Sequence, residues 1–426
     1  MILAYRVLTS LLYPFLFIFI YYRKILKKED SKRFKEKILV SHFNASKKKD
    51  CKLIWFHAAS VGEFKSIIPI INQLKINKTF KFLVTTTTLS SGNLAKIELE
   101  KFDNVEHRYF PFDVVFLIDE FLSLWKPNKI FLVDSEIWPN LILQAKKHKI
   151  PIALINARLT SKSFNKWMIF PNVARKIFGI FTLCICSNAE TKNYLEKLNL
   201  KNIYFKGNIK LIEDFNNKKI ENINQDLLLK KRFWFAASTH KEEDIICLKT
   251  HIELKKKFAD IITIIAPRHI ERTDKIQSLS KKFNLKTQIL NRNENILDGN
   301  EIIIINHFGA LKDYFAYAKS VFIGKSMIKK FEKDGGQNPI EAAKLKCKIY
   351  HGPYVYNFDE IYKILENYGI SQQIENYFEL SDNLKTDLQK PFKESNQISN
   401  PIEKLGQKTL IDTMKIVDDF VKNDAN

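Results

Sequence analysis

The feature that most constrains the fold is an alternation between short, strand-sized apolar runs and longer helical patterns. Short runs rich in Ile and Val are typical of parallel strands that are buried on both faces. Five occur in the first half of the chain, at 53–58, 81–86, 129–133, 151–155 and 181–186. Five more follow a charged segment at 211–231; they lie at 232–237, 261–266, 301–305, 319–323 and 347–351. The pattern predicts an α/β chain of two Rossmann-like domains, with ligands bound between them at the strand ends.

Glycine usage excludes two common nucleotide-binding classes. The 426 residues suffice for two domains but contain only 12 glycines. No GxGxxG follows the first strand, and GxxxxGK[ST] does not occur. These absences argue against a dinucleotide oxidoreductase and against a P-loop NTPase.

The N-terminus reads as a membrane segment. Residues 7–22 carry no charge, and Arg23 and Lys24 begin a basic cluster directly after them. The length is borderline for a spanning helix, which needs roughly 20 apolar residues. No small-residue cleavage site follows, and the basic flank favours a cytoplasmic body. We therefore expect a single retained anchor, with a helix lying in the membrane interface as the alternative.

The net charge and the cysteines indicate which partners and which cellular compartment suit the chain beyond its N-terminal segment. The formal net charge of +22 comes from 69 Lys and Arg against 47 Asp and Glu. Such an excess suits an anionic partner, namely nucleic acid, acidic membrane or a phosphorylated substrate, although lysine-rich coding bias also produces it. The five cysteines form neither a CxxC pair nor a zinc-ligand pattern, which favours a reducing, cytoplasmic compartment.

Four segments in the first half place polar residues after predicted strands. The segment 58–64 contains Ser60, Gly62 and Glu63. Ser60 and Glu63 fit a capping box, and Glu63 also fits a general base kept ionised by the helix dipole. The other three segments supply Asp134 and Glu136 at 133–142, Arg158 at 156–164, and Lys210 at 206–210.

Three segments in the second half have the same character. The first, 236–244, contains Ser238 and Thr239, and the spacing of Thr239 to Glu242 fits a helix cap. The second, 266–272, offers Arg268 and His269, and an Arg side chain matches two phosphate oxygens. The third, 335–344, fits a helix start at which Asn338 is the cap, Pro339 and Ile340 follow, and Glu341 is the third helical residue. Free N–H groups there suit a phosphate, and the carboxylate suits a ribose.

Together these segments resemble the 3-deoxy-D-manno-octulosonic acid (Kdo) transferases of lipopolysaccharide synthesis, glycosyltransferase family 30. The resemblance runs from the N-terminus to about residue 360. It is carried by HAASVGE, SEIWPN, NARLT, GNIK, AASTH, PRH, and GGQNPIEAA followed by GPYVYNF.

The resemblance implies a GT-B fold, in which two Rossmann-like domains face a cleft. The boundaries that we expect are a membrane anchor at 1–24, an acceptor-binding domain at 25–215, a CMP-sugar-binding domain at 216–402, and a C-terminal helix at 403–426 that crosses back to the first domain.

The resemblance also implies the reaction. Kdo would pass from CMP-Kdo to lipid IVA, the lipid A precursor, with inversion and without a metal or other cofactor. Glu63 would be the general base, supported by Glu136 and Lys210. The expected CMP-binding residues are Arg268, His269, Gly309, Ala310, Leu311, Asn338, Pro339, Ile340 and Glu341. Ser60, Gly62, Arg158, Ser238 and Thr239 would line the cleft. The enzyme would work at the cytoplasmic side of the inner membrane, on its anionic surface, without nucleic acid.

Three segments depart from the family pattern, at four positions. Ala310 follows Gly309 where an acidic residue is usual, so a loop carboxylate on the nucleotide is missing. Lys325 stands where the family has a small residue, and Asp134-Ser135 replaces Glu-Thr. Glu63, Arg268 and Glu341 are all retained, so we expect an active enzyme.

Two other functions fit the layout less well. A GT-B enzyme could use a UDP-sugar on a lipid, which competition between CMP and UDP would distinguish. A non-catalytic basic adaptor for membrane or nucleic acid would show a basic stripe interleaved with stacking aromatic residues, and the sequence shows none clearly.

Overall fold

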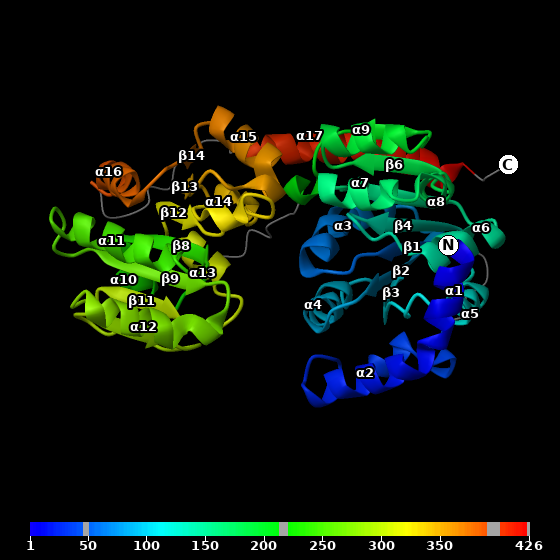
Figure 1. Cartoon of the computed structure of the whole chain (residues 1–426), viewed down its shortest axis with the longest axis horizontal. Helices are drawn as coiled ribbons and strands as arrows, with labels where there is room; N and C mark the ends of the chain where they lie inside the picture. Colours follow the sequence, from blue (N-terminus) through cyan, green and yellow to red (C-terminus); the bar gives the residue numbers. More distant parts are fainter. Residues whose placement is uncertain (46–50, 213–219, 390–400, 424–426) are drawn as a thin grey trace. The chain divides into compact units, whose positions relative to one another are not determined.

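The computed structural model describes residues 1–45, 51–212, 220–389 and 401–423. By its internal contacts the chain divides into two compact units, one comprising 1–214 and 405–426 and the other 215–404. Each unit is a parallel β-sheet with α-helices packed against it (Figure 1). The two-unit α/β class predicted from the alternation is therefore the observed one.

Unit 1 contains a seven-stranded sheet in the order β3-β2-β1-β4-β5-β6-β7, and every neighbouring pair is parallel. Its strands are β1 (Lys52–His57), β2 (Phe80–Thr86), β3 (Val105–Tyr109), β4 (Lys129–Val133), β5 (Ile152–Ala157), β6 (Leu183–Cys186) and β7 (Ile203–Phe205). The chain order reverses direction at β1, so the loops after β1 and β4 emerge side by side at the carboxyl edge.

Helices cover both faces of this sheet. Those within the first 214 residues are α1 (Ile2–Leu11), α2 (Tyr13–Ile25), α3 (Val61–Leu74), α4 (Leu89–Leu99), α5 (Val115–Trp125), α6 (Pro139–Lys147), α7 (Ser161–Met168), α8 (Pro171–Phe178) and α9 (Ala189–Lys197). One core lies between the sheet and α5, α6 and α8, and the other lies on the α3 face. Strands that are covered on both sides carry continuous apolar runs, and this is why the runs were visible in the sequence.

Unit 2 repeats the arrangement with the order β10-β11-β9-β8-β12-β13-β14, again entirely parallel. Its strands are β8 (Phe233–Thr239), β9 (Ile262–Pro267), β10 (Thr287–Leu290), β11 (Ile302–Ile305), β12 (Ser320–Ile323), β13 (Lys348–His351) and β14 (Ser371–Gln373). Its helices are α10 (Gln225–Lys230), α11 (Glu243–Lys255), α12 (Thr273–Lys282), α13 (Leu311–Phe315), α14 (Ile340–Lys344), α15 (Asp359–Asn367) and α16 (Tyr377–Asp387). The segment 211–231 contains α10 within its second half, and residues 213–219 lie outside the described part.

The four strands that sequence reasoning missed are the two edge strands of each sheet, β3, β7, β10 and β14. All are short and partly exposed; β7, for example, has no buried residue. An edge strand borders solvent and therefore tolerates polar residues, as VEHRY in β3 illustrates. A search for uninterrupted apolar runs detects only central strands.

The last helix, α17 (Pro401–Lys422), belongs to unit 1 from Leu405 onward. Val417 and Val421 lie in the core on the α3 face, and the Phe420 ring meets the Phe131 ring edge-on. The Lys129 side chain donates to the carbonyl of Asn423. Residues near the C-terminal end of the chain thus complete the core of unit 1.

The N-terminal segment is not one straight helix. Neither α1 nor α2 alone is long and apolar enough to cross a bilayer; in the described part of the chain, only this pair meets the length and hydropathy requirement when taken together, and it bends by 56°. Tyr5 and Thr9 bond to Asp113 and Asn140, and Tyr13 donates to the carbonyl of Ile38. These polar bonds hold one side of the pair against the unit 1 body (Figure 1).

Candidate active site

Glu63 lies in the first turn of α3, directly after β1 at the carboxyl edge of the unit 1 sheet. One carboxylate oxygen accepts from the backbone N–H of Ala59 at 2.8 Å, and the other accepts from the Ser60 hydroxyl at 2.6 Å. The Ser60 oxygen in turn caps the helix by accepting from the N–H of Glu63. The predicted cap at Ser60 is therefore present, but the capping box is not complete, because Glu63 accepts from the N–H of Ala59 and the hydroxyl of Ser60 and not from the backbone N–H of Ser60. The side chain is held in one place, as a catalytic carboxylate requires.

A second carboxylate, Glu136, follows β4, the neighbour of β1. It accepts from the indole N–H of Trp138 at 2.8 Å, and a ring nitrogen of His57 lies 3.3 Å away. The other ring nitrogen of His57 bonds to the Thr85 hydroxyl at 2.9 Å. His57 is fully buried, so it fixes Glu136 from beneath the site. Sequence reasoning quoted His57 in its motif but gave it no role.

Asp134 and Lys210 form an ion pair at the same edge. Asp134 adopts a left-handed backbone conformation with φ of 62°, and its carbonyl accepts from the N–H of Arg158 at 3.2 Å. Lys210 lies in a short 3₁₀ turn after β7, and the neighbouring residue Ile209 donates to the Asn156 side chain. The site residues predicted for unit 1 are therefore brought together, although they come from four separate segments.

The carboxylates influence one another. Burial is the largest cause that raises the pKa of Glu63 above its usual value of 4.5, and the charges of Glu136 and Asp134 raise it further. The hydrogen bonds from Ser60 and Ala59 act in the opposite direction. A raised pKa makes Glu63 a stronger base than an exposed glutamate. Gly62, by contrast, is exposed, with nothing within 4 Å of where a Cβ would lie, so the structure gives it no special steric role.

In unit 2, Arg268 and His269 follow β9 and are both exposed. The Arg268 N–H donates to the carbonyl of Thr239 at 3.0 Å, which joins the ends of β8 and β9. The side chains of Arg268 and His269 therefore project from an anchored turn, where they are accessible to an anion.

The cap predicted for Thr239 and Glu242 is wrong. Thr239 is the last residue of β8, and its hydroxyl donates to Asp244, which also pairs with Arg272. A bulge at Ser238, with φ of 56°, extends the strand past its predicted end. The N–H of His240 is satisfied instead by Glu243, at 2.8 Å. The spacing of Thr239 to Glu242 fits a cap, but Thr239, the expected cap residue, belongs to the strand.

The segments expected to bind CMP lie at further strand ends of the same sheet. Helix α14 begins at Ile340, one residue later than predicted; Pro339 precedes it, and the Asn338 side chain accepts from the N–H of Ile340 at 3.0 Å. Glu341 is partly exposed in its first turn. Between β11 and α13, Gly309 is exposed with φ of 88°, which only glycine adopts readily, while Ala310 is buried and Leu311 begins the helix.

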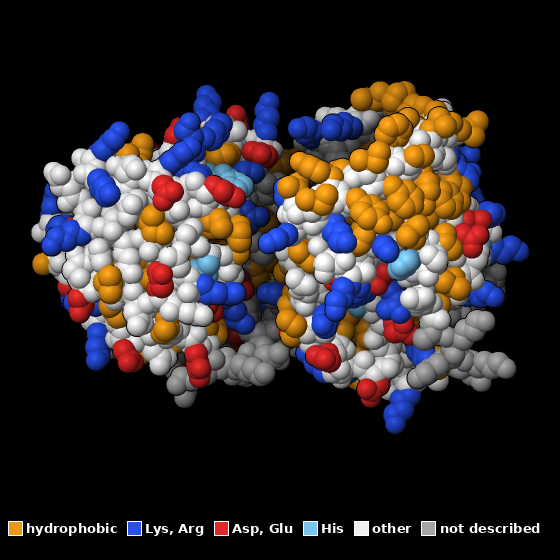
Figure 2. All heavy atoms as spheres, turned by 90° about the horizontal axis from the view of Figure 1, so that it is seen from below, with side chains coloured by type: hydrophobic (Ala, Val, Ile, Leu, Met, Phe, Trp, Pro, Cys, Tyr) orange, Lys and Arg blue, Asp and Glu red, His pale blue; other side chains and the backbone are white. Residues whose placement is uncertain are grey.

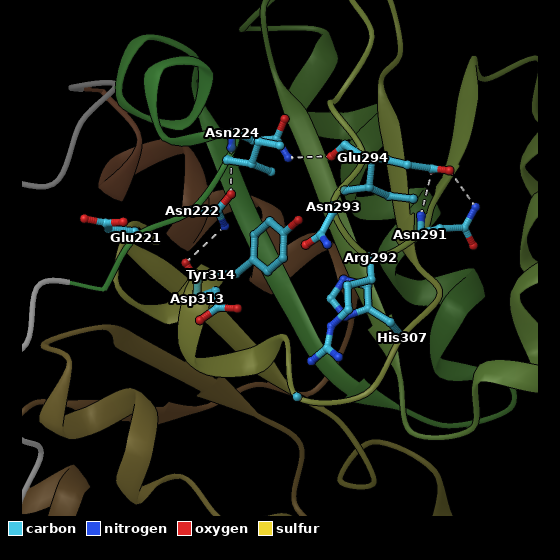
Figure 3. A pocket seen from close by; sticks show the side chains of 13 residues that line it. Glu221, Asn222, Asn224, Asn291, Arg292, Asn293, Glu294, His307, Asp313 and Tyr314 are labelled. Atoms are coloured by element: carbon cyan, nitrogen blue, oxygen red, sulfur yellow. Dashed lines mark hydrogen bonds between the residues drawn. The ribbon is translucent and has the colours of Figure 1, made fainter.

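A pocket of about 140 Å³ borders Gly309. Figure 3 shows Arg292 and His307 side by side on one wall, and Asn222, Asn224, Asp313 and Tyr314 on another. The Asn222 amide donates to the carbonyl of Asp313, and the Asn224 amide donates to that of Glu294. Burial raises the pKa of Asp313, while His307, Lys312 and Arg292 act against it. The pocket offers hydrogen-bond donors and acceptors for a small polar group. Of its lining residues the sequence predicted a role for Gly309 alone, because the walls come from three separate segments.

Sequence reasoning gave no role to His240, another residue of unit 2. Burial lowers the pKa of its imidazole to about 4, and the positive charges of Lys325, His269, Arg272 and Arg268 lower it further. Its Nε2 atom is buried without a hydrogen-bond partner in the described structure. A neutral ring surrounded by cations marks a place with positive potential, which suits an anionic ligand. In the described residues, no group of three or more His, Cys, Asp or Glu side chains is arranged to hold a metal ion.

Comparison with known proteins points to one family. A family model described as 3-deoxy-D-manno-octulosonic-acid transferase (kdotransferase) matches residues 32–212. A Rickettsia typhi protein named 3-deoxy-D-manno-octulosonic acid transferase is 30% identical over 436 residues, which cover 91% of each chain. A Haemophilus influenzae protein of the same name is 31% identical and covers 73% of each chain. The probable mitochondrial 3-deoxy-D-manno-octulosonic acid transferase of Arabidopsis thaliana is 29% identical, over 85% of this chain and 82% of its own.

Solved structures show the same fold at low sequence identity. A UDP-N-acetylglucosamine 2-epimerase matches with a TM-score of 0.59 and 16% identity, over 89% of this chain and 99% of its own. A glycosyltransferase from Rickettsia africae matches with a TM-score of 0.55 and 12% identity, over 88% of this chain and all of its own. At such identity the likeness establishes the fold, which is of the GT-B class.

Proposed function

The chain belongs to the family of 3-deoxy-D-manno-octulosonic acid transferases, and from this premise we propose that it transfers Kdo from CMP-Kdo to lipid IVA in lipopolysaccharide synthesis. The observation that carries the proposal is a sequence identity of 30% over 91% of both chains, a span that includes the polar segments of both units. The fixed position of Glu63 beside two further carboxylates supports its assigned chemistry.

In the proposed reaction Glu63 acts as the general base on the primary hydroxyl of the acceptor. The carboxylate takes the hydroxyl proton, and the freed oxygen forms a bond to the anomeric carbon of Kdo. The bond from that carbon to the phosphate of CMP breaks, so that CMP leaves with the electron pair and the configuration inverts. Glu136 and the Asp134–Lys210 pair would position the acceptor and stabilise positive charge on the sugar ring. We propose that no metal ion takes part.

Positively charged side chains in unit 2 support the assignment of the donor site. The leaving phosphate gains negative charge as CMP departs, and Arg268 and His269 are exposed where they could reach it. Burial is the main cause of the lowered pKa of His240, and the nearby charges of Lys325 and Arg272, which lower it further, add to the positive potential there. The N–H groups near Asn338, the carboxylate of Glu341 and the pocket at Gly309 would hold the nucleoside.

An assay of product mass tests the proposal directly. The purified chain is incubated with lipid IVA and with CMP-Kdo generated in situ, with and without a chelator, and the lipid is analysed by mass spectrometry. A mass increase of one or more Kdo units, unchanged by the chelator, is expected. If CMP binds but the lipid mass does not change, another acidic-sugar donor or lipid acceptor takes the place of this pair. Stronger competition by UDP than by CMP would favour a UDP-sugar enzyme instead.

The raised pKa of Glu63 predicts a specific pH dependence. Only the ionised carboxylate accepts a proton, so kcat/KM should fall as the pH drops through a value above 4.5. Replacing Glu136 by Gln removes a negative charge that raises the pKa of Glu63, so the acid limb should move to lower pH. The measurement is the pH–rate profile of both proteins. An unchanged or raised midpoint in the variant would show that Glu63 does not control the acid limb.

We further propose that the N-terminal pair lies in the membrane interface instead of spanning the bilayer. One side of the pair bonds to unit 1, and its other side exposes an N-terminal apolar face formed by Leu3, Leu8, Leu11, Phe15, Ile18, Phe19, Tyr22 and Ile25. Figure 2 shows hydrophobic side chains gathered over one area of the surface on the side where α2 lies in Figure 1. Basic residues after α2, such as Lys27 and Lys28, suit anionic headgroups.

Replacing Leu8, Phe15 and Ile18 by Ser should release the protein from vesicles that contain anionic lipid. Removing three large apolar side chains from the interface should lower the partition coefficient about 100-fold. Flotation of the protein with vesicles measures this, and Ser at Ile76 and Ile97, which are equally exposed elsewhere in unit 1, is the matched control.

The two membrane arrangements differ in the position of the N-terminus. An epitope tag at residue 1 should be accessible from the same membrane face as the body of the protein. A tag accessible only from the opposite face would establish a spanning anchor and overturn the interfacial arrangement.

A further inference from the structure

Unit 2 contains a fully buried carboxylate that the proposed reaction does not use. Glu243 is the first residue of α11, and its exposed fraction is 0%. One oxygen accepts from the N–H groups of His240 at 2.8 Å and Lys325 at 2.7 Å. The other accepts from those of Ser326 at 2.8 Å and Met327 at 3.0 Å. All four acceptor positions of the carboxylate are thus occupied by backbone donors.

These bonds join the loops after two neighbouring strands. His240 follows β8, and the segment 325–327 follows β12, which pairs with β8 in the sheet. Both loops contain a non-glycine residue in the left-handed region: Glu242 with φ of 82° and Lys325 with φ of 60°. Such conformations persist where the surroundings hold them in place. Glu243 supplies that hold from the interior, because its carboxylate bonds to the backbone of both loops; at the surface the side chains of Lys330 and Glu242 also join them, at 3.1 Å.

The segment 324–327 also bonds to the loop 335–341, which is expected to bind the nucleotide, and to residues 352 and 354. Its Lys325 carbonyl accepts from the N–H of Gly336, two residues before Asn338, at 2.7 Å. The Ser326 hydroxyl accepts from the N–H of Gly352, and the Ser326 carbonyl accepts from the N–H of Tyr354; both distances are 2.9 Å. Gly324 has no room for a side chain, because a Cβ would lie 2.7 Å from the Ser238 carbonyl and 2.8 Å from a Glu243 oxygen.

We propose that Glu243 is the positioning residue of the donor site: its carboxylate ties the loops after β8 and β12 together and thereby sets the loop 335–341 for CMP-Kdo. This inference rests on the proposed function for the identity of the ligand, and on the four backbone hydrogen bonds to the carboxylate for the role of Glu243. It also explains why a Lys at position 325, where the family has a small residue, is compatible with the site. The carboxylate bonds to the backbone N–H of that residue, which any side chain leaves available.

The test is the Glu243→Gln variant of the full chain in detergent micelles. An amide retains only one acceptor oxygen, so its NH₂ group would face two of the four backbone donors. We expect the Kd for CMP, measured by calorimetry, to rise about tenfold, which corresponds to about 1.4 kcal/mol. The KM for CMP-Kdo should rise similarly, while kcat changes little. Hydrogen exchange at residues 240 and 325–327 should accelerate, while β8 and β9 stay protected.

A matched control separates positioning from general stability. Asp113 is a buried carboxylate of unit 1 that accepts from the N–H groups of Asn140 and Leu141 and from the Tyr5 hydroxyl. Asp113→Asn should lower the melting temperature without changing the Kd for CMP. If Glu243→Gln does not fold, Gly324→Ala is used, because its Cβ forces the same two loops apart, and a comparable loss of CMP affinity is expected.

The outcomes distinguish the two proposals. A folded Glu243→Gln protein with wild-type CMP affinity and wild-type exchange at 325–327 overturns the positioning role, as does a Gly324→Ala protein with wild-type affinity. If the wild type itself fails to bind CMP, the proposed function is at fault, and the exchange measurement, which needs no ligand, still decides whether Glu243 holds the loops.

Discussion

Replacing Glu63 by Gln is expected to lower kcat for Kdo transfer about 10³-fold, since general base catalysis contributes about 10²–10⁴-fold. Glutamine keeps the shape of the side chain and can still accept the bond from Ala59, so α3 should remain capped. It cannot take the proton of the acceptor hydroxyl. The transfer rate is measured by mass spectrometry of the lipid, together with the affinity for CMP.

Two comparisons make this result interpretable. Glu98→Gln, on the exposed side of α4 where Glu98 pairs with Lys101, should transfer Kdo at the wild-type rate. The Glu63 variant should bind CMP as the wild type does, because all expected CMP-binding residues lie in unit 2. A variant that retains a tenth or more of the wild-type rate would show that another group accepts the proton, and Glu136 would be the next residue to replace.

The second large effect is expected at Arg268. Arg268→Ala should lower kcat/KM for CMP-Kdo about 10²-fold, mainly through a higher KM, because the variant loses a charge-assisted contact to the donor phosphate. Arg268→Lys should recover part of the loss, since Lys retains the charge but not the planar fork. The measurement is steady-state kinetics at several salt concentrations, and the wild type should show the stronger salt dependence.

The matched control for Arg268 lies at the other end of the same sheet. Arg232 directly precedes β8, where it pairs with Asp260 and donates to the carbonyl of Leu388. Arg232→Ala should cost some stability while leaving the KM for CMP-Kdo unchanged. Equal kinetic losses in both variants would assign the Arg268 effect to the overall charge of unit 2 and not to a contact with the donor.

The sequence by itself determined the ten central strands and the position of the polar segments after them. Central strands such as β4 and β11 are buried on both faces, so each needs an unbroken apolar run. The carboxyl ends of parallel strands meet at one edge of a sheet, so Glu63, Glu136 and Arg268 were predicted at strand ends without knowledge of any contact. The cap at Ser60 was equally readable, because its bonds join residues within one turn.

Only the tertiary structure decided which polar groups meet across long sequence separations. Lys210 pairs with Asp134, His57 lies beneath Glu136, and Glu243 bonds to the backbone of residues more than eighty positions away. The edge strands and the bend between α1 and α2 belong to the same category, since solvent and neighbouring elements select them. The physical reason is the range of the interactions. Burial periodicity and capping are local and leave a pattern along the chain, whereas a hydrogen bond between distant segments depends on where the packed sheet places both partners.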